Sequence, residues 1–200
     1  MTSKSFALPG QPCPNCRKNF LSLAESVEQV EHFGPVLLTT ISCSQCGYKD
    51  TDVSSIHARE PSVMRARITS GKDLSIKVIR SKYAIIRIPE LGVSISPRTA
   101  AEGFITNVEG VLVKIQQVLE GITPSLSKQK RRRAKATLTK LKKAREGKLG
   151  FVVELKDPSG VSAIVGSDTT KMTRRLLTKK ELEKLRKQLP TLLEVGSRPR

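Results

Sequence analysis

Four cysteines in two closely spaced pairs constrain this sequence more than any other feature. Cys13 and Cys16 form one Cys-x-x-Cys pair, Cys43 and Cys46 form a second, and residues 17–42 separate them. A Cys-x-x-Cys turn presents two thiolates from one tight backbone loop, and two such turns complete the tetrahedral sulfur site that Zn²⁺ prefers. The protein then fills all four ligand positions, so the spacing predicts one structural zinc ion and no open position for catalysis.

Other uses of these cysteines fit the sequence less well. A redox Cys-x-x-Cys needs a thioredoxin-like βαβ setting, and two disulfides need an oxidising compartment. The sequence shows neither that setting nor the basic-then-apolar layout of a signal peptide. Four thiolates also suit iron, so zinc and iron both stay open at this stage. His32 and His57 are expected to be surface or packing residues, because the cysteines already complete the site.

The segment between the two pairs predicts a long hairpin. Residues 25–31 and 36–42 have the composition of strands, and His32-Phe33-Gly34-Pro35 supplies a turn between them. A hairpin of this length returns the second cysteine pair to the first. We therefore expect a zinc ribbon over residues 1–56.

The rest of the chain predicts a mostly β protein with an inserted helical hairpin. Apolar runs typical of short strands lie at 63–68, 74–79, 83–88, 91–95, 151–155 and 161–165. Between them, a capping box at residues 106–109 begins one helix and Ser127 begins a second, with stops at Gly121 and Gly147. Aromatic residues make up 4% of the chain and Trp is absent, so the core must be aliphatic. We expect a compact β domain over residues 57–170, with the helical hairpin at about 106–147.

Basic charge is concentrated in two segments. The chain carries 36 Lys and Arg against 18 Asp and Glu, a net charge of +18. Residues 128–150 hold 11 basic residues and 1 acidic residue, and residues 171–200 hold 10 basic and 3 acidic residues. A second capping box at residues 178–181 predicts a short basic helix that ends before Pro190. Residues 171–200 are thus expected to form a basic C-terminal helix and a tail that frays after Gly196.

These motifs together resemble the ZPR-one type zinc-finger protein family, in the short single-module form found in archaea. The finger continues past Cys46 as Gly47-Tyr48-Lys49, and the segments 88–91, 103–110 and 157–160 follow in the family's order. The resemblance covers about residues 11–167. It implies a β-helix-like domain with a helical hairpin insertion after the finger. From the eukaryotic members it also implies binding to translation elongation factor 1A and assistance to the folding of that GTPase.

The candidate partner contacts form two sets. Contacts with elongation factor 1A are expected at Phe33, Tyr48 and Asp52 of the ribbon and at Asp157, Ser159 and Gly160 of a turn in the β domain. Structural roles in the metal knuckle, the ribbon and the turn are the alternative for these residues. Contacts with a polyanion are expected at Lys130, Arg131, Arg132, Arg133, Lys142 and Lys143, with a solvated basic face as the alternative.

The sequence favours binding over catalysis. It contains no GxxxxGK[ST] phosphate loop and no cysteine left over to act as a nucleophile. No apolar run approaches the length of a membrane span. We expect a cytoplasmic, non-enzymatic zinc protein that binds elongation factor 1A. The second hypothesis is a nucleic-acid-binding or ribosome-associated protein that uses the basic helices. Such binding would depend on shape and charge, because residues 128–150 offer no aromatic side chain for base stacking.

Overall fold

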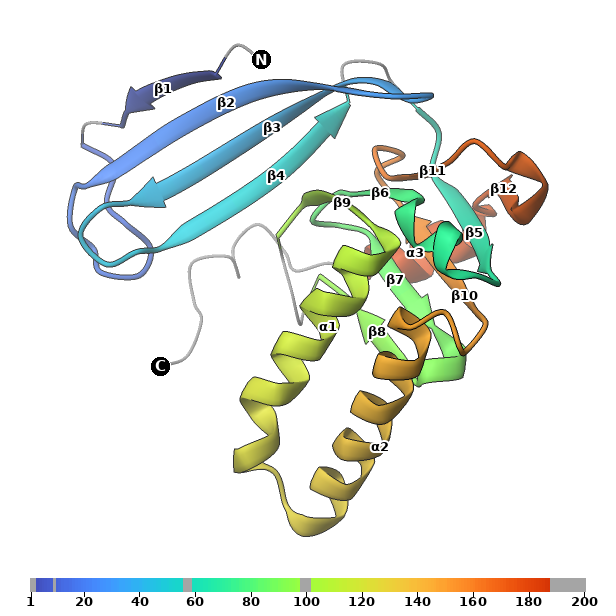
Figure 1. Cartoon of the computed structure of the whole chain (residues 1–200). Helices are drawn as coiled ribbons and strands as arrows, with labels where there is room; N and C mark the ends of the chain where they lie inside the picture. The colour runs from blue at the N-terminus through green and yellow to red at the C-terminus, as the bar shows by residue number, and fades with distance from the viewer. Residues whose placement is uncertain (1–2, 9, 56–58, 98–101, 188–200) are drawn as a thin grey trace.

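The computed structural model describes residues 3–8, 10–55, 59–97 and 102–187. Figure 1 shows a long curved sheet at one end of the molecule, a β domain beside it, and a helical hairpin that projects from the β domain. Within the described residues, no helix is both long and apolar enough to cross a membrane. The expectations for His57, for Pro190 and for the tail after Gly196 concern residues outside the described ones.

The first sheet has four antiparallel strands in the order β1-β2-β3-β4. They are β1 (Ser3–Ala7), β2 (Leu21–Val30), β3 (Gly34–Cys43) and β4 (Lys49–Ser55). The predicted hairpin is confirmed, and its strands are longer than expected: β2 and β3 stay in register from Leu21 opposite Cys43 to Val30 opposite Gly34. The turn between them places His32 and Gly34 at positive φ, 62° and 99°. This unbroken pairing brings the second cysteine pair back to the first.

The β domain consists of two further antiparallel sheets. The five-stranded sheet has the order β12 (Met172–Leu176), β5 (Ser62–Ile68), β10 (Phe151–Asp157), β7 (Ile85–Ile88) and β8 (Val93–Ile95). The three-stranded sheet has the order β11 (Ala163–Val165), β6 (Lys77–Arg80) and β9 (Phe104–Asn107). The strand expected at 74–79 begins only at Lys77, because a 3₁₀ turn at Gly71–Ser75 precedes it. In that turn the Asp73 carboxylate accepts hydrogen bonds from the backbone N–H groups of Thr69 and Ser70.

The expected helical hairpin lies between β9 and β10. It consists of α1 (Val108–Ile122) and α2 (Lys128–Arg145), and Gly147 follows α2 at a φ of 69°. The predicted capping box at residues 106–109 is wrong by one position: Asn107 is the N-cap, and its side chain accepts from the Gly110 N–H at 2.8 Å. Thr106 remains extended because it pairs with Val78 of β6.

A third helix, α3 (Lys179–Arg186), follows β12. Its predicted capping box is confirmed: the Thr178 hydroxyl accepts from the Glu181 N–H, and the Glu181 carboxylate accepts from the Thr178 N–H. This exchange satisfies two of the backbone donors that the first turn of a helix leaves free. A strand, β12, precedes this helix, so the C-terminal segment adds an edge to the five-stranded sheet.

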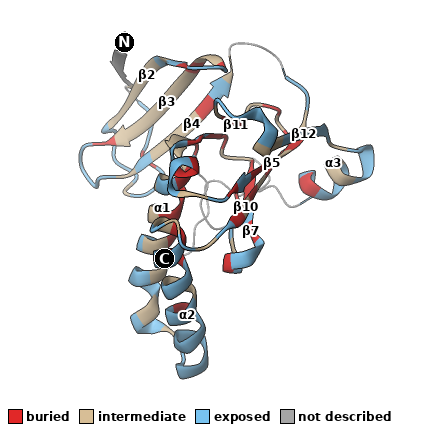
Figure 2. Ribbon diagram, turned by 45° about the vertical axis from the view of Figure 1, so that its right-hand side comes forward, coloured by how far each residue is buried: buried red, intermediate tan, exposed pale blue. Residues whose placement is uncertain are grey.

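Two hydrophobic clusters hold the molecule together. The larger cluster is aliphatic apart from Phe151 and fills the β domain, where Val108, Leu112 and Leu141 anchor the helical hairpin. The smaller cluster joins Val36 and Val53 of the ribbon to Ile79 and to Ala163 and Val165 of the β domain. Figure 2 shows buried residues at the base of the hairpin and along the strands, whereas the far end of the hairpin is mostly exposed.

Candidate metal centre

The four cysteine sulfurs converge at one end of the ribbon sheet. Cys43 is the last residue of β3, and Cys13, Cys16 and Cys46 lie in the two loops beside it. The Sγ atoms lie 3.7 Å apart in the pairs Cys13–Cys46 and Cys16–Cys43, and all four lie within 4.8 Å of one another. Cys13 and Cys43 are buried, Cys16 is half-buried and Cys46 is exposed.

Two knuckles with the same backbone pattern present these sulfurs. The C=O of Cys13 accepts from the N–H of Arg17 at 2.8 Å, and the C=O of Cys43 accepts from the N–H of Gly47 at 3.0 Å. Arg17 and Gly47 both have left-handed backbones, with φ of 60° and 70°. Each knuckle turns both of its sulfurs toward the same point.

The arrangement fits a zinc ion. Four thiolates at about 2.3 Å from a tetrahedral Zn²⁺ lie roughly 3.8 Å from one another, close to the 3.7 Å of the two contacting pairs. All the donors are sulfur, and four of them close the coordination shell. When bound, the ion cross-links the two loops and supplies folding energy to the ribbon.

The groups around the sulfurs shift the pKa values of Cys16 and Cys46 in opposite directions. The Asn15 side chain donates to the Cys46 Sγ at 3.5 Å, and this contact together with the Tyr48 N–H lowers the pKa of Cys46 to about 6. The Lys18 N–H lowers the pKa of Cys16, but desolvation and the other three thiols outweigh it and raise that pKa to about 11. The raised pKa of Cys16 keeps its proton on at neutral pH without metal, so metal binding there releases a proton. Asn15, inside the first Cys-x-x-Cys, was not predicted to contribute, and spacing gives no signal for it.

Phe33 lies at the opposite end of the ribbon, where the ribbon meets the β domain. Its ring is 8% exposed and belongs to the smaller hydrophobic cluster. The Arg59 guanidinium lies 3.9 Å above the ring and donates to the Phe33 C=O at 2.8 Å. This burial gives Phe33 a packing role at the junction, and its contact with a partner stays a prediction. Arg59, which the sequence did not single out, holds it there.

Tyr48 and Asp52 lie on the ribbon away from that junction and are both half-buried. Asp52 accepts from the Val53 N–H through Oδ1 and forms an ion pair with Lys82 through Oδ2 at 2.9 Å. Lys82 belongs to the β domain, and the pairing raises its pKa although its burial opposes this. Asp52 therefore bridges the ribbon and the β domain. Partner contacts by these two residues stay a prediction.

Asp157, Ser159 and Gly160 form a tightly bonded turn after β10. Asp157 is 1% exposed; Oδ1 accepts from the Ser159 N–H at 2.7 Å and hydroxyl at 2.6 Å, and Oδ2 accepts from the Ser162 N–H at 2.6 Å. Gly160 has a φ of 77°, and a Cβ there would lie 2.1 Å from the Arg59 carbonyl oxygen. The turn thus contacts Arg59 closely, with Asp157 and Gly160 buried and Ser159 half-buried. Partner contacts by these three residues stay a prediction.

Arg80 supports a second contact between the ribbon and the β domain. It is fully buried and donates to the carbonyl groups of Ala84 and Glu102. Burial lowers its pKa to about 10, against the opposing effect of Asp157 and Glu102. The next residue, Gly103, donates its N–H to the Thr51 C=O of β4 at 2.7 Å. Arg80 therefore fixes the strand segment that touches the ribbon edge.

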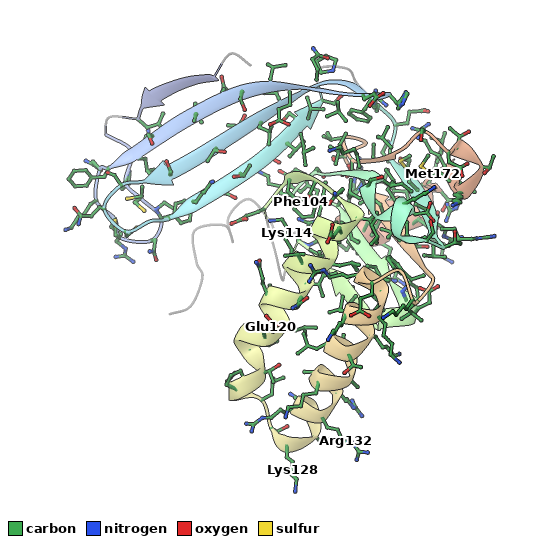
Figure 3. All side chains as sticks on the ribbon, viewed as in Figure 1. Phe104, Lys114, Glu120, Lys128, Arg132 and Met172 are labelled. Atoms are coloured by element: carbon green, nitrogen blue, oxygen red, sulfur yellow. The ribbon has the colours of Figure 1, made fainter. Side chains whose placement is uncertain are left out.

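The polyanion candidates all lie on α2, and the structure divides them. Arg131 donates to the C=O groups of Pro124 and Leu126, at 2.9 and 3.1 Å, and so closes the turn between the two helices. Lys130, Arg132, Arg133, Lys142 and Lys143 are exposed. Figure 3 shows Lys128 and Arg132 pointing outward at the far end of the hairpin.

A pocket of about 460 Å³ lies on the β domain, lined in part by Arg65, Arg67, Glu154 and Lys171. Its groups largely neutralise one another: Arg65 pairs with Glu154 at 2.6 Å, and Lys171 with Asp73 at 2.7 Å. Its lining contains neither cysteine nor histidine. The first pair joins the neighbouring strands β5 and β10, and the second joins two 3₁₀ turns.

The fold and the metal centre define a protein that joins a four-cysteine zinc ribbon to an antiparallel β domain with a helical insertion. The zinc-finger domain of ZPR1 matches residues 7–61, and the ZPR1 jelly-roll domain matches residues 72–192. The chain belongs to the ZPR1 family. The predicted fold class and the single structural zinc ion are confirmed, and the jelly-roll description refines the β-helix-like expectation.

Relatives of this chain occur in archaea and eukaryotes. A ZPR1-like protein of Pyrococcus horikoshii is 37% identical over 180 residues, 88% of this chain and 79% of the relative. A ZPR1-like protein of Methanocaldococcus jannaschii is 37% identical over 177 residues, 87% of each chain. The zinc finger chaperone zpr1 of Schizosaccharomyces pombe is 28% identical over 153 residues, 73% of this chain and 33% of the relative. The chain thus spans about a third of that chaperone's length.

Proposed function

We propose that this protein is a cytoplasmic, non-enzymatic folding factor that binds translation elongation factor 1A through the outer face of its zinc ribbon. The name of the Schizosaccharomyces pombe relative, a zinc finger chaperone, supports a role in protein folding. The identity of the client comes from what the eukaryotic members of the family imply. The surface is inferred from the ribbon itself.

The ribbon has two faces, because side chains alternate along a strand. One face carries Val36 and Val53 and packs on the β domain. The opposite face carries Leu23 opposite Ile41 and Val27 opposite Leu37. We call these four residues the ribbon outer face. Leu23, Leu37 and Ile41 are half-buried and Val27 is 38% exposed, so in the described residues nothing covers this face completely.

This outer face is the observation that carries the proposal. Apolar side chains that stay partly exposed on a sheet face are candidates for an interaction site. By strand register, Glu25 opposite Thr39 lies between the two apolar pairs, and Asp50 and Asp52 lie beside them on β4. Asp52 is already paired with Lys82 of the β domain, so Glu25 and Asp50 supply the acidic charge of this face. A folding client presents apolar segments that are not yet buried, and such a face suits them.

A refolding assay tests the proposal. Elongation factor 1A from the same organism is denatured in guanidinium, diluted into buffer with zinc-loaded protein, and assayed for recovered guanine nucleotide binding. We expect a several-fold higher yield with the wild type and the basal yield with Val27→Glu/Leu37→Glu.

The matched control is Val118→Glu/Ile122→Glu, which adds the same charge at two exposed apolar positions of α1, 61% and 44% exposed. This control should assist refolding as the wild type does. Equal refolding with and without wild-type protein would overturn the function. Full assistance by a folded outer-face variant would overturn the assignment of the surface.

A further inference from the structure

We infer that α2 carries a phosphate-binding stripe that holds the backbone of a structured nucleic acid. The stripe consists of Lys128, Arg132, Lys135, Lys142 and Lys143. It is separate from the ribbon outer face, so this inference stands or falls independently of the proposed function.

The five stripe residues lie on the side of α2 that faces away from the protein. The helix buries Ala134, Leu141 and Ala144, and at 100° per residue the stripe residues fall on the opposite side. All five are exposed. From Lys128 to Lys143 the stripe extends about 22 Å at 1.5 Å per residue. A rigid helix therefore displays a row of cations on the projecting hairpin (Figures 1 and 3).

The stripe is distinct from the cations of α2 that serve the fold. Arg131 binds carbonyl groups of the interhelical turn, Lys140 donates to the Glu90 C=O at 3.1 Å, and Arg145 donates to the Gln116 side chain at 2.9 Å. Across the ranges that the structure describes, the five stripe side chains form no hydrogen bond or ion pair, and Lys142 lies close enough to Glu146 to help lower the pKa of that carboxyl. Most of the stripe's charge is thus available to an external ligand.

The stripe is unfavourable for the helix that carries it. α2 contains no acidic residue, so the usual i to i+4 ion pairs of an exposed helix are missing, and pairs such as Lys128 and Arg132 repel each other. The positive end of the helix dipole adds to this repulsion at the N-terminus, where Lys128 stands in the first turn and Ser127 makes no side-chain cap. A polyanion along the stripe removes both penalties.

The chemistry of the stripe favours nucleic acid over an acidic protein. Four of its five residues are lysine, and the polar Thr139 lies among them. The centres of protein interfaces are poor in lysine and rich in apolar anchors, whereas interfaces with nucleic acids are polar and strongly positive. α2 also lacks aromatic residues, so it offers no platform for unpaired bases. The partner is therefore recognised through the phosphates of a helical region.

The inference is tested by fluorescence anisotropy with labelled 20-base-pair duplexes of RNA and of DNA. Binding is measured at several salt concentrations from 50 to 200 mM. Each phosphate neutralised contributes about −0.9 to the log–log salt slope for duplex DNA. For Arg132→Gln/Lys135→Gln/Lys142→Gln we expect at least tenfold weaker binding at 100 mM salt and a slope smaller by roughly two to three. Glutamine keeps the helical preference, and circular dichroism checks that the helices persist.

The matched control removes the same charge from α3, as Lys179→Gln/Lys180→Gln/Lys184→Gln, at three exposed positions. It should bind within about threefold of the wild type. Binding of RNA alone, or of both duplexes alike, supports the stripe and identifies the source of the phosphates. No binding to either duplex at 50 mM salt, or equal losses in both variants, overturns it. If neither duplex binds but the α2 variant alone loses elongation factor 1A, the stripe serves an acidic protein instead.

Discussion

Gly160 and Gly47 show two different reasons why a position requires glycine. Both have left-handed backbones, at φ of 77° and 70°. Around Gly47 nothing lies within 4 Å of an added Cβ, whereas at Gly160 the added Cβ would meet the Arg59 carbonyl oxygen at 2.1 Å. At the first position conformation alone favours glycine, although Arg17 adopts a similar backbone in the other knuckle. At the second position both the conformation and the approach of another chain segment require it.

Substitution by alanine at these two positions should therefore lower the free energy of unfolding by different amounts. Gly47→Ala is expected to lower the free energy of unfolding by about 1 kcal/mol, the usual penalty for a left-handed alanine. Gly160→Ala should lower it by at least roughly 3 kcal/mol, because the Arg59 backbone must also move. Urea denaturation of the zinc-loaded proteins measures both, and equal losses would show that the turn does not press on Arg59.

Asp73 makes the stability depend on pH. Burial raises its pKa, but Lys171 and the hydrogen bonds from Thr69 and Ser70 outweigh this and hold the pKa well below its usual range. A carboxyl with a depressed folded pKa stabilises the protein above its unfolded pKa of about 3.9, and this contribution is lost as pH falls through the folded value.

Asp73→Asn should therefore be less stable than the wild type at pH 6, by about 1–3 kcal/mol, and this difference should shrink towards pH 2. Urea denaturation at pH 6, 4 and 2 measures the difference. The control is Glu146→Gln, whose carboxyl is exposed and pairs with Lys148. A difference between Asp73→Asn and wild type that stays constant with pH would contradict the assigned role of the carboxylate.

Among the helices and strands, the features that depend on local sequence pattern were predicted best from the sequence. The knuckles, the long hairpin and the two helices follow from residue spacing, because each forms through contacts between near neighbours. The capping position of α1 was missed by one residue, because pairing of Thr106 with β6 overrides the local capping preference. The burial of Phe33 was missed for the same kind of reason: its cover comes from Arg59 and the distant β domain.

Removal of the metal tests the ribbon as an element. The four cysteine sulfurs lie within 4.8 Å of one another, and a bound ion would cross-link the two knuckles and supply folding energy to the ribbon. Chelation of zinc, or Cys43→Ser, should abolish the ordered ribbon, with release of one zinc ion per chain. Metal analysis together with amide hydrogen exchange of β2 and β3 measures this. Unchanged protection of these strands without metal would contradict it.

At the scale of the whole molecule, the ribbon and the β domain share a core. Val36 and Val53 pack with Ile79, Asp52 pairs with Lys82, and Gly103 bonds to Thr51. These contacts come from three separate parts of the β domain. They orient the ribbon so that one face is covered and the ribbon outer face points outward.

Loss of this shared core should uncouple the two parts. Ile79→Ala removes a fully buried side chain and should cost about 2–5 kcal/mol. Thermal unfolding followed by calorimetry should change from one transition in the wild type to two in this variant. Leu91→Ala leaves a cavity in the larger cluster only. It should lower the melting temperature but keep a single transition. Two transitions in the wild type would show that the junction does not couple the parts.

The central claim is that a rigidly held zinc ribbon presents an apolar face to elongation factor 1A. The sharpest test is isothermal titration calorimetry of the zinc-loaded protein with elongation factor 1A. The elongation factor is newly diluted from denaturant under conditions that slow its refolding. Our account predicts saturable one-to-one binding by the wild type and by Val118→Glu/Ile122→Glu, and no binding by Val27→Glu/Leu37→Glu. Absence of binding by the wild type, or undiminished binding by the folded Val27→Glu/Leu37→Glu variant, would contradict it.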